Sequence, residues 1–176
     1  MAHPEQRDFF NKLRALFPDA FVANRVLEIG SLNINGTVRD FFNAEEYVGV
    51  DVAEGAGVDV VAYGQEVDAA DGWFDCVVSA ECFEHNPFWR ETFANMIRMS
   101  NRYVFFTCAT EGRAEHGTTR TTPQDSPLTL EWDYYYNLTE DDFRFFFNFD
   151  DLFEQYAFEV NPVSCDLYFY GIKRVQ

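Results

Sequence analysis

Residues 25–51 constrain the fold more than any other part of this chain, because they have the pattern of a β-α-β unit. A first apolar run carries Glu28 next to its end, and a turn with glycine and asparagine follows. A short amphipathic stretch then leads to a second apolar run, Tyr47–Val50, which ends at Asp51. Open α/β sheets bind ligands at the carboxyl ends of their strands. Asp51 lies about 20 residues beyond Gly30, the separation expected of a carboxylate that accepts ribose hydroxyls.

The length and composition indicate one globular domain. The chain has 176 residues, of which 47% are apolar and 18% aromatic, enough to build a sizeable core. It contains no run of about 18 apolar residues, so we expect no membrane span. The N-terminus lacks a basic segment that leads into an apolar one, and we therefore expect a cytoplasmic protein.

The charge balance argues against polyanionic partners. The chain carries 13 Lys and Arg against 30 Asp and Glu, a formal net charge of −17. Binding to duplex nucleic acid or to an anionic membrane normally needs a basic stripe, so we expect neither partner. The four cysteines are scattered, which favours buried thiols over disulfides or zinc ligands: Cys76, Cys82, Cys108 and Cys165.

Periodicity predicts alternating helices and strands. Apolar residues at helical spacing predict a helix over 5–17, and a second, short helix carries Val38, Phe41 and Phe42. A third helix should open at Asn86-Pro87, because asparagine caps well and proline suits the first turn. We expect five strands in this part of the chain: Arg25–Ile29, Tyr47–Val50, Val58–Val61, Phe74–Ser79 and Arg102–Thr107.

The remainder divides into a long loop and a C-terminal unit. Residues 108–138 lack periodicity, and their tryptophan and tyrosines predict an ordered lid over the substrate. Thr139 and Asp142 resemble a capping box at the start of a helix. Two β-rich segments, Ala157–Val160 and Leu167–Lys173, lie too close for a helical crossover and should form an antiparallel hairpin. The whole predicts an α/β fold with a core over 25–107 and a C-terminal unit over 139–176.

The first turn does not fit two familiar nucleotide-binding patterns. A P-loop needs four residues between its glycines and a following lysine, whereas Gly30 and Gly36 enclose five residues and Thr37 follows. A dinucleotide fingerprint needs a second glycine where Leu32 stands, so a nicotinamide-dependent oxidoreductase is the weaker alternative.

Three segments together resemble the class I S-adenosylmethionine-dependent methyltransferases. Val26–Gly30 with Asn33 and Gly36 is similar to their first motif, and Tyr47–Asp51 to their second strand with its ribose-binding acid. Phe74–His85 resembles their fourth-strand motif, in which FD begins and EH ends the segment. The resemblance implies a Rossmann-like, mostly parallel sheet with a C-terminal antiparallel hairpin, and S-adenosylmethionine as cofactor.

The resemblance also implies a set of cofactor-binding residues. Glu28 would lie under the methionine portion or order the turn, Gly30 would let the cofactor approach, and Asp51 would bind the ribose. Leu32 replaces the middle glycine of the motif, and the asparagine after it tolerates left-handed backbone. Tyr63 stands where many relatives have an adenine-binding Asp, so Gln65 or the backbone would make that contact. The expected set is Glu28, Gly30, Ser31, Asn33, Gly36, Asp51, Val52, Ser79 and Glu81.

An oxygen acceptor would need help to lose its proton, since a neutral hydroxyl is a weak nucleophile. Glu84, His85 and His116 are the candidate catalytic residues. His85 has an alternative role in packing or capping after the fourth strand, and His116 has one as an ordinary loop residue. We expect methyl transfer to a small-molecule or carbohydrate acceptor, with a non-catalytic binding protein of the same fold as the alternative.

A divalent metal is a further possible cofactor. The stretch Glu81-x-x-Glu84-His85 resembles the metal-binding segment of certain metal-dependent O-methyltransferases, which complete the site with a later histidine. Tyr134–Asn137 occupy that later place in this chain, which leaves the expected set of Mg²⁺ or Mn²⁺ ligands incomplete.

Overall fold

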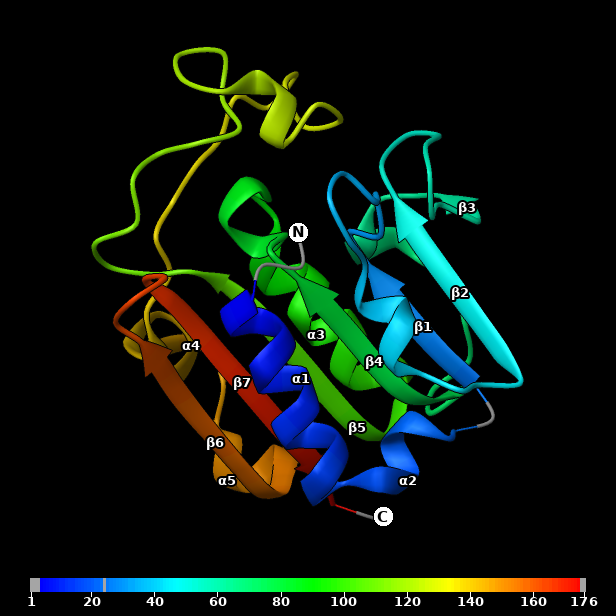
Figure 1. Ribbon diagram of the computed structural model, residues 1–176. Helices are drawn as coiled ribbons and strands as arrows, with labels where there is room; N and C mark the ends of the chain where they lie inside the picture. The colour runs from blue at the N-terminus through cyan, green and yellow to red at the C-terminus, as the bar shows by residue number, and fades with distance from the viewer. Residues whose placement is uncertain (1–3, 24, 175–176) are drawn as a thin grey trace.

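The computed structural model describes residues 4–23 and 25–174 and has one seven-stranded sheet at its centre (Figure 1). The strand order is β3-β2-β1-β4-β5-β7-β6, parallel from β3 to β5, with β7 antiparallel to both β5 and β6. The predicted α/β class and the C-terminal hairpin are confirmed. The strands are β1 Arg25–Ile29, β2 Glu46–Asp51, β3 Val60–Val61, β4 Phe74–Ala80, β5 Ser100–Ala109, β6 Phe153–Asn161 and β7 Asp166–Lys173.

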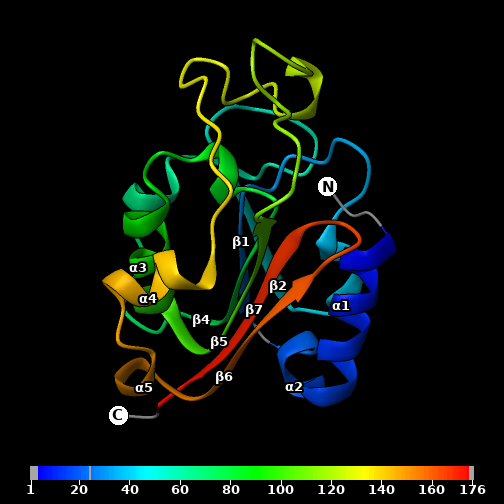
Figure 2. The same cartoon turned by 90° about the vertical axis from the view of Figure 1, so that its left-hand side faces the viewer.

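Helices cover both faces of the sheet. In Figure 2, α1 (Pro4–Leu16) and α2 (Pro18–Phe21) lie on one side, and α3 (Trp89–Met99), α4 (Glu140–Phe146) and α5 (Phe149–Leu152) lie on the other. The central strands β1 and β4 are therefore buried on both faces, which explains their nearly continuous apolar sequence. None of the helices in the described ranges is long and apolar enough to cross a membrane.

Phenylalanine fills the two cores between the sheet and its helices. Phe93 of α3 is fully buried and packs edge-on against the rings of Phe83, Phe106 and Phe143. On the opposite face, Phe10 of α1 is equally buried. Offset and edge-to-face ring pairs contribute about 0.5–1.5 kcal/mol beyond area burial. The aromatic composition thus holds the helical layers against the sheet.

Three predicted elements differ from the structure. The expected helix after β1 is a single 3₁₀ turn, Val38–Phe41, and β3 has two residues instead of four. Helix α3 begins at Trp89, because the Asn86 side chain accepts the Phe88 N–H at 2.8 Å and so forms a turn ahead of the helix. Local sequence patterns do not show where contacts with neighbouring segments end a helix or strand.

The lid leaves the sheet after β5 and returns at α4, so it begins at residue 110 and not at the predicted 108, because residues 108–109 continue β5. Its one regular element is the 3₁₀ turn Pro123–Asp125, and Figure 1 places the loop beyond the carboxyl ends of the parallel strands. The predicted capping box is confirmed: Thr139 Oγ1 accepts the Asp142 N–H, and the Asp142 carboxylate accepts the Thr139 N–H at 2.8 Å. The four cysteines are free thiols, and Cys76 and Cys108 are buried as expected, whereas Cys82 and Cys165 are only partly buried.

Candidate functional site

The carboxyl ends of β1, β2 and β4 meet in one cavity of about 590 Å³ beneath the lid. Gly30, Asp51 and Glu81, which follow or end these three strands, all line it. The lid contributes the opposite wall through Arg113, His116 and residues 125–129. Strand-end residues far apart in sequence therefore converge on one space.

A second cavity of about 320 Å³ continues the first along β2. The two share Gly30, Asp51, Cys82 and Thr129, so together they form one crevice. The second part is mainly apolar, and Trp132 of the lid closes its outer side. One crevice thus has a polar end under His116 and an apolar end under Trp132.

The turn after β1 depends on a glycine at position 30. Gly30 has a φ of +79°, and a Cβ there would lie 2.6 Å from Cys82 Cβ. The N–H groups of Gly30 and Ser31 donate to Val50 O at 2.9 and 3.1 Å. Asn33 is exposed and outside the left-handed region, and its side chain instead accepts the Gly36 N–H at 2.9 Å. A side-chain hydrogen bond, and not left-handed backbone, stabilises the turn where the expected glycine is missing.

Asp51 is held by the backbone around the crevice. Its two carboxylate oxygens accept the N–H groups of Leu32 at 2.9 Å and Val52 at 2.8 Å. Burial raises the pKa of Asp51 above its ordinary value, and these two hydrogen bonds oppose the rise. Val52 itself lines the apolar end. The Asp51 carboxylate is therefore fixed in direction before any ligand arrives.

A small recess lies behind the turn, lined by Glu28, Ser31 and Gln6. Glu28 accepts the Tyr47 hydroxyl at 2.9 Å, and burial raises the pKa of Glu28 to about 7. The Ser31 hydroxyl is buried and has no hydrogen-bond partner among the residues that the structure describes. Polar groups held in this way are available to a ligand that reaches the recess.

Ser79 and Asn33 line neither the crevice nor the recess, whereas Gly36 lines the recess. Ser79 instead has a structural role. Its fully buried hydroxyl donates to Ile29 O at 2.9 Å and ties β4 to β1. Glu81, two residues later, does face the crevice and has a left-handed φ of 52°. A left-handed backbone costs free energy in a non-glycine residue, and residues with this backbone cluster at functional sites.

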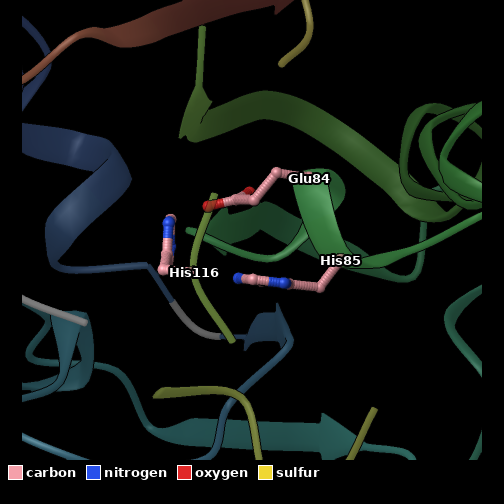
Figure 3. Close-up of side chains that lie close together, drawn as sticks. All are labelled: Glu84, His85 and His116. Atoms are coloured by element: carbon pink, nitrogen blue, oxygen red, sulfur yellow. The ribbon is translucent and has the colours of Figure 1, made fainter. Parts of the chain in front are cut away.

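Glu84, His85 and His116 come together at the polar end. One ligand atom from each lies within 4.8 Å of the others, and the two imidazole rings are 5.0 Å apart between centroids. Figure 3 shows the Glu84 carboxylate and the His85 ring, both from the turn after β4, directed toward His116 of the lid. The structure thus joins all three candidate catalytic residues, although 31 positions separate His116 from His85.

Burial dominates the electrostatics of this cluster. Burial, together with the charge of the neighbouring His116, lowers the pKa of His85 to about 3. Burial also lowers the pKa of His116. It raises the pKa of Glu84 well above its usual range, as do the nearby carboxylates of Glu81 and Asp166. Both imidazoles are therefore neutral at neutral pH and have a nitrogen lone pair available.

No protein-family model matches the sequence, and no curated protein does. Solved structures match over most of the chain. Phosphoethanolamine N-methyltransferase 2 from Haemonchus contortus, in complex with S-adenosyl-L-methionine, has a TM-score of 0.65 at 13% identity, covering 94% of this chain and 52% of its own. The N-methyltransferase NodS from Bradyrhizobium japonicum, in complex with S-adenosyl-l-homocysteine, has a TM-score of 0.63 at 13% identity, covering 97% of this chain and 88% of its own. A SAM-dependent methyltransferase from Archaeoglobus fulgidus has a TM-score of 0.60 at 15% identity, covering 95% of this chain and 94% of its own.

The fold is that of the class I S-adenosylmethionine-dependent methyltransferases. The predicted resemblance is confirmed at this level.

Tyr63 and Gln65, the two residues considered for the adenine contact, lie in different places relative to the apolar end of this methyltransferase fold. Tyr63 is exposed at the rim, with its ring 5.7 Å from the Trp132 ring. Gln65 accepts a hydrogen bond from Thr92 of α3 at 3.3 Å and does not line the crevice. The aromatic pair at the rim, and not the amide, is therefore close to the apolar end.

Sequence reasoning missed two polar residues of the site. Gln6 of α1 donates to Thr107 Oγ1 at 2.8 Å and lies 3.4 Å from Glu81 Oε1. It stands on the same helical stripe as Phe9 and Phe10, and a polar residue on an apolar stripe was the available signal. Arg113 of the lid lines the polar end and pairs with fully buried Asp166 at 3.0 Å. No local pattern distinguishes this arginine from an ordinary loop residue.

Proposed function

We propose that this protein transfers the methyl group of S-adenosylmethionine to a hydroxyl oxygen of a small-molecule or carbohydrate acceptor. The observation that carries the proposal is the single crevice in which Gly30, Asp51 and Glu81 meet the Glu84, His85 and His116 cluster. Solved structures of the same fold hold S-adenosylmethionine or its product.

The floor of the crevice supports a defined orientation of the cofactor. Asp51 would accept the ribose hydroxyls, and Gly30 would leave room for the cofactor backbone. The recess with Glu28 and Ser31 would receive the methionine portion, while the apolar end beneath Trp132 would receive adenine. The sulfonium would then lie between the two ends, beside the strand-end carboxylates, which stabilise a cation.

The polar end supports the choice of acceptor. Besides the cluster, it is lined by Arg113 together with Asp125, Ser126 and Thr129, which offer donors and acceptors suited to a hydroxylated compound. The fold itself does not select oxygen, because two of its solved relatives are N-methyltransferases. Oxygen is favoured by the neutral imidazoles of His85 and His116, which would accept the proton of a hydroxyl group.

Methyl transfer requires little beyond placement, because the sulfonium methyl is already reactive. Holding donor and acceptor in line and excluding water supplies most of the acceleration. The lid over residues 110–138 would exclude water, and its polar residues would select the acceptor. The free thiols suit a reducing compartment, so a cytoplasmic location forms part of this proposal.

Calorimetric titration tests the proposal at its first step. We expect S-adenosylmethionine and S-adenosylhomocysteine to bind with micromolar affinity and to raise the melting temperature, and NAD(P) to do neither. Turnover is then followed as S-adenosylhomocysteine release against a panel of polyols, phenols and amines. No binding at high micromolar cofactor would favour a non-catalytic protein of this fold, and NAD(P) binding alone would favour an oxidoreductase.

A further inference from the structure

The strongest unexplained feature is a buried acid without a partner. Glu84 is completely buried, and neither of its carboxylate oxygens has a hydrogen-bond partner within the described chain. Nδ1 of His85, also buried, has none either. Buried polar groups are almost always satisfied, so three unsatisfied atoms in one place need an explanation.

The spacing of the cluster suits an ion better than direct hydrogen bonds. Ligand atoms that share a metal at about 2.1 Å lie roughly 3–4 Å from one another. The three ligand atoms of the cluster lie within 4.8 Å of one another, and none of the residues bonds to another. A side-chain adjustment of under about 1 Å would bring them to coordination distance.

The lid presents His116 in the manner of a metal ligand. Its Nδ1 is 3.1 Å from Ala114 O, which leaves Nε2 as the available nitrogen. Tyr135 donates to the same carbonyl at 3.2 Å, and its ring lies 5.0 Å from that of His116 and 5.5 Å from that of His85. Metal-binding histidines usually donate their second ring nitrogen to a carbonyl or carboxylate, which fixes the ring.

We propose that Glu84, His85 and His116 bind one divalent transition-metal ion, with open coordination positions toward the crevice. One carboxylate and two imidazoles favour Mn²⁺, Fe²⁺, Co²⁺ or Zn²⁺ over Mg²⁺ and Ca²⁺, which prefer oxygen ligands. Both histidines line the crevice, so a further ligand can reach the ion from that side. The nearby carboxylates of Glu81 and Asp166 add negative charge that a cation would offset.

This ion would take the acceptor oxygen, an inference that rests on the proposed function. The acceptor hydroxyl would coordinate at an open position, and its proton would leave to water because the cation stabilises the alkoxide. The oxygen would then form a bond to the methyl carbon. The carbon–sulfur bond would break with its electron pair remaining on sulfur, which yields S-adenosylhomocysteine and the methyl ether.

The test is a metal titration of the full chain after treatment with EDTA. We expect one Co²⁺ to bind with micromolar affinity by calorimetry, with visible absorption bands that report nitrogen coordination. His116→Ala should weaken the affinity at least tenfold without loss of the folded state, because this residue lies in the lid. Glu84→Gln should weaken it further. Glu111→Gln, an exposed lid acid, is the matched control and should change nothing.

Two results would overturn the metal site: no Co²⁺ binding by the wild-type chain at 100-fold over the protein concentration, or equal binding by the wild type and His116→Ala. A parallel S-adenosylmethionine titration separates this inference from the proposed function. Cofactor binding without metal binding removes only the ion, whereas metal binding without cofactor binding keeps the site and removes the methyl transfer.

Discussion

The floor and the lid of the crevice are built in different ways. The floor is fixed by backbone groups: Gly30 and Ser31 donate their N–H groups to Val50 O of β2, and the Asp51 carboxylate accepts the N–H groups of Leu32 and Val52. The lid is held largely by its own side chains, such as Arg120, which pairs with Asp133 at 2.6 Å and with Glu115 at 2.7 Å. Exposed pairs of this kind contribute about 0–1 kcal/mol each.

This difference assigns separate tasks to the two regions. Backbone geometry follows from the sheet, so the floor suits a ligand common to the fold, the cofactor. Side-chain networks in loops vary without loss of the fold, so the lid suits recognition of an acceptor particular to this chain. Variants of the floor should therefore change cofactor affinity, and variants of the lid should change turnover.

The largest expected effect is at the floor, for Gly30→Ala. The added Cβ would meet Cys82 at 2.6 Å in left-handed backbone, which should cost about 3 kcal/mol of unfolding free energy and abolish cofactor binding. Gly72→Ala is the matched control, since Gly72 is also left-handed but its nearest neighbour would be 3.8 Å away. Urea unfolding and calorimetry measure both. Equal losses for the two variants would show that strain alone matters.

Asp51→Ala should weaken S-adenosylmethionine binding about 30–100-fold, because it removes the carboxylate proposed to accept the ribose hydroxyls. Glu54→Ala, an exposed acid three residues later, should leave the affinity unchanged. Calorimetry of the two variants side by side decides the matter. An Asp51 variant with wild-type affinity would remove this residue from the floor.

A pH series tests the electrostatics of the floor through Glu28. The pKa of Glu28 is about 7 in the folded state, above the ordinary value of 4.5, because the carboxyl is buried. Its protonated form therefore favours folding, fully below pH 4.5, and this contribution is lost as pH rises toward 7 and above.

Glu28→Gln removes this titration while it keeps an acceptor for Tyr47. We expect the wild type to lose about 2 kcal/mol relative to the variant between pH 5 and 8. Urea midpoints at each pH provide the measurement, with Glu46→Gln, an exposed acid of β2, as control. Parallel pH curves for wild type and Glu28→Gln would contradict the buried, protonated state.

The smallest expected effect is at Trp132, where lid and floor meet. Trp132→Ala should weaken S-adenosylhomocysteine binding only about fivefold, because the ring closes the apolar end without a hydrogen bond to it. Cofactor binding should quench the fluorescence of the wild type, and this quenching should fall in the variant. Trp73 is exposed and remote from the crevice, so Trp73→Ala should keep both the affinity and the quenching. A loss as large as that of Asp51→Ala would make the lid part of the cofactor site.

The sequence revealed most of what the sheet determines. Strands are apolar runs, and an acid at a strand end, such as Asp51, can be recognised from the sequence alone. Arg113 and Gln6 were not found, because their place in the crevice depends on a loop path and on the angle of a helix. The metal set looked incomplete for the same reason: His116 reaches Glu84 only through the fold of the lid.

The reach of Gln6 makes the first helix more than a cover for the sheet. A shortened chain that starts at Arg25 would keep every carboxylate at a strand end, yet it would lose the hydrogen bond from Gln6 to Glu81. A fusion partner or tag attached ahead of Pro4 would strain the same helix. Assays of the proposed methyl transfer should therefore use protein that keeps α1 and its contact with Glu81.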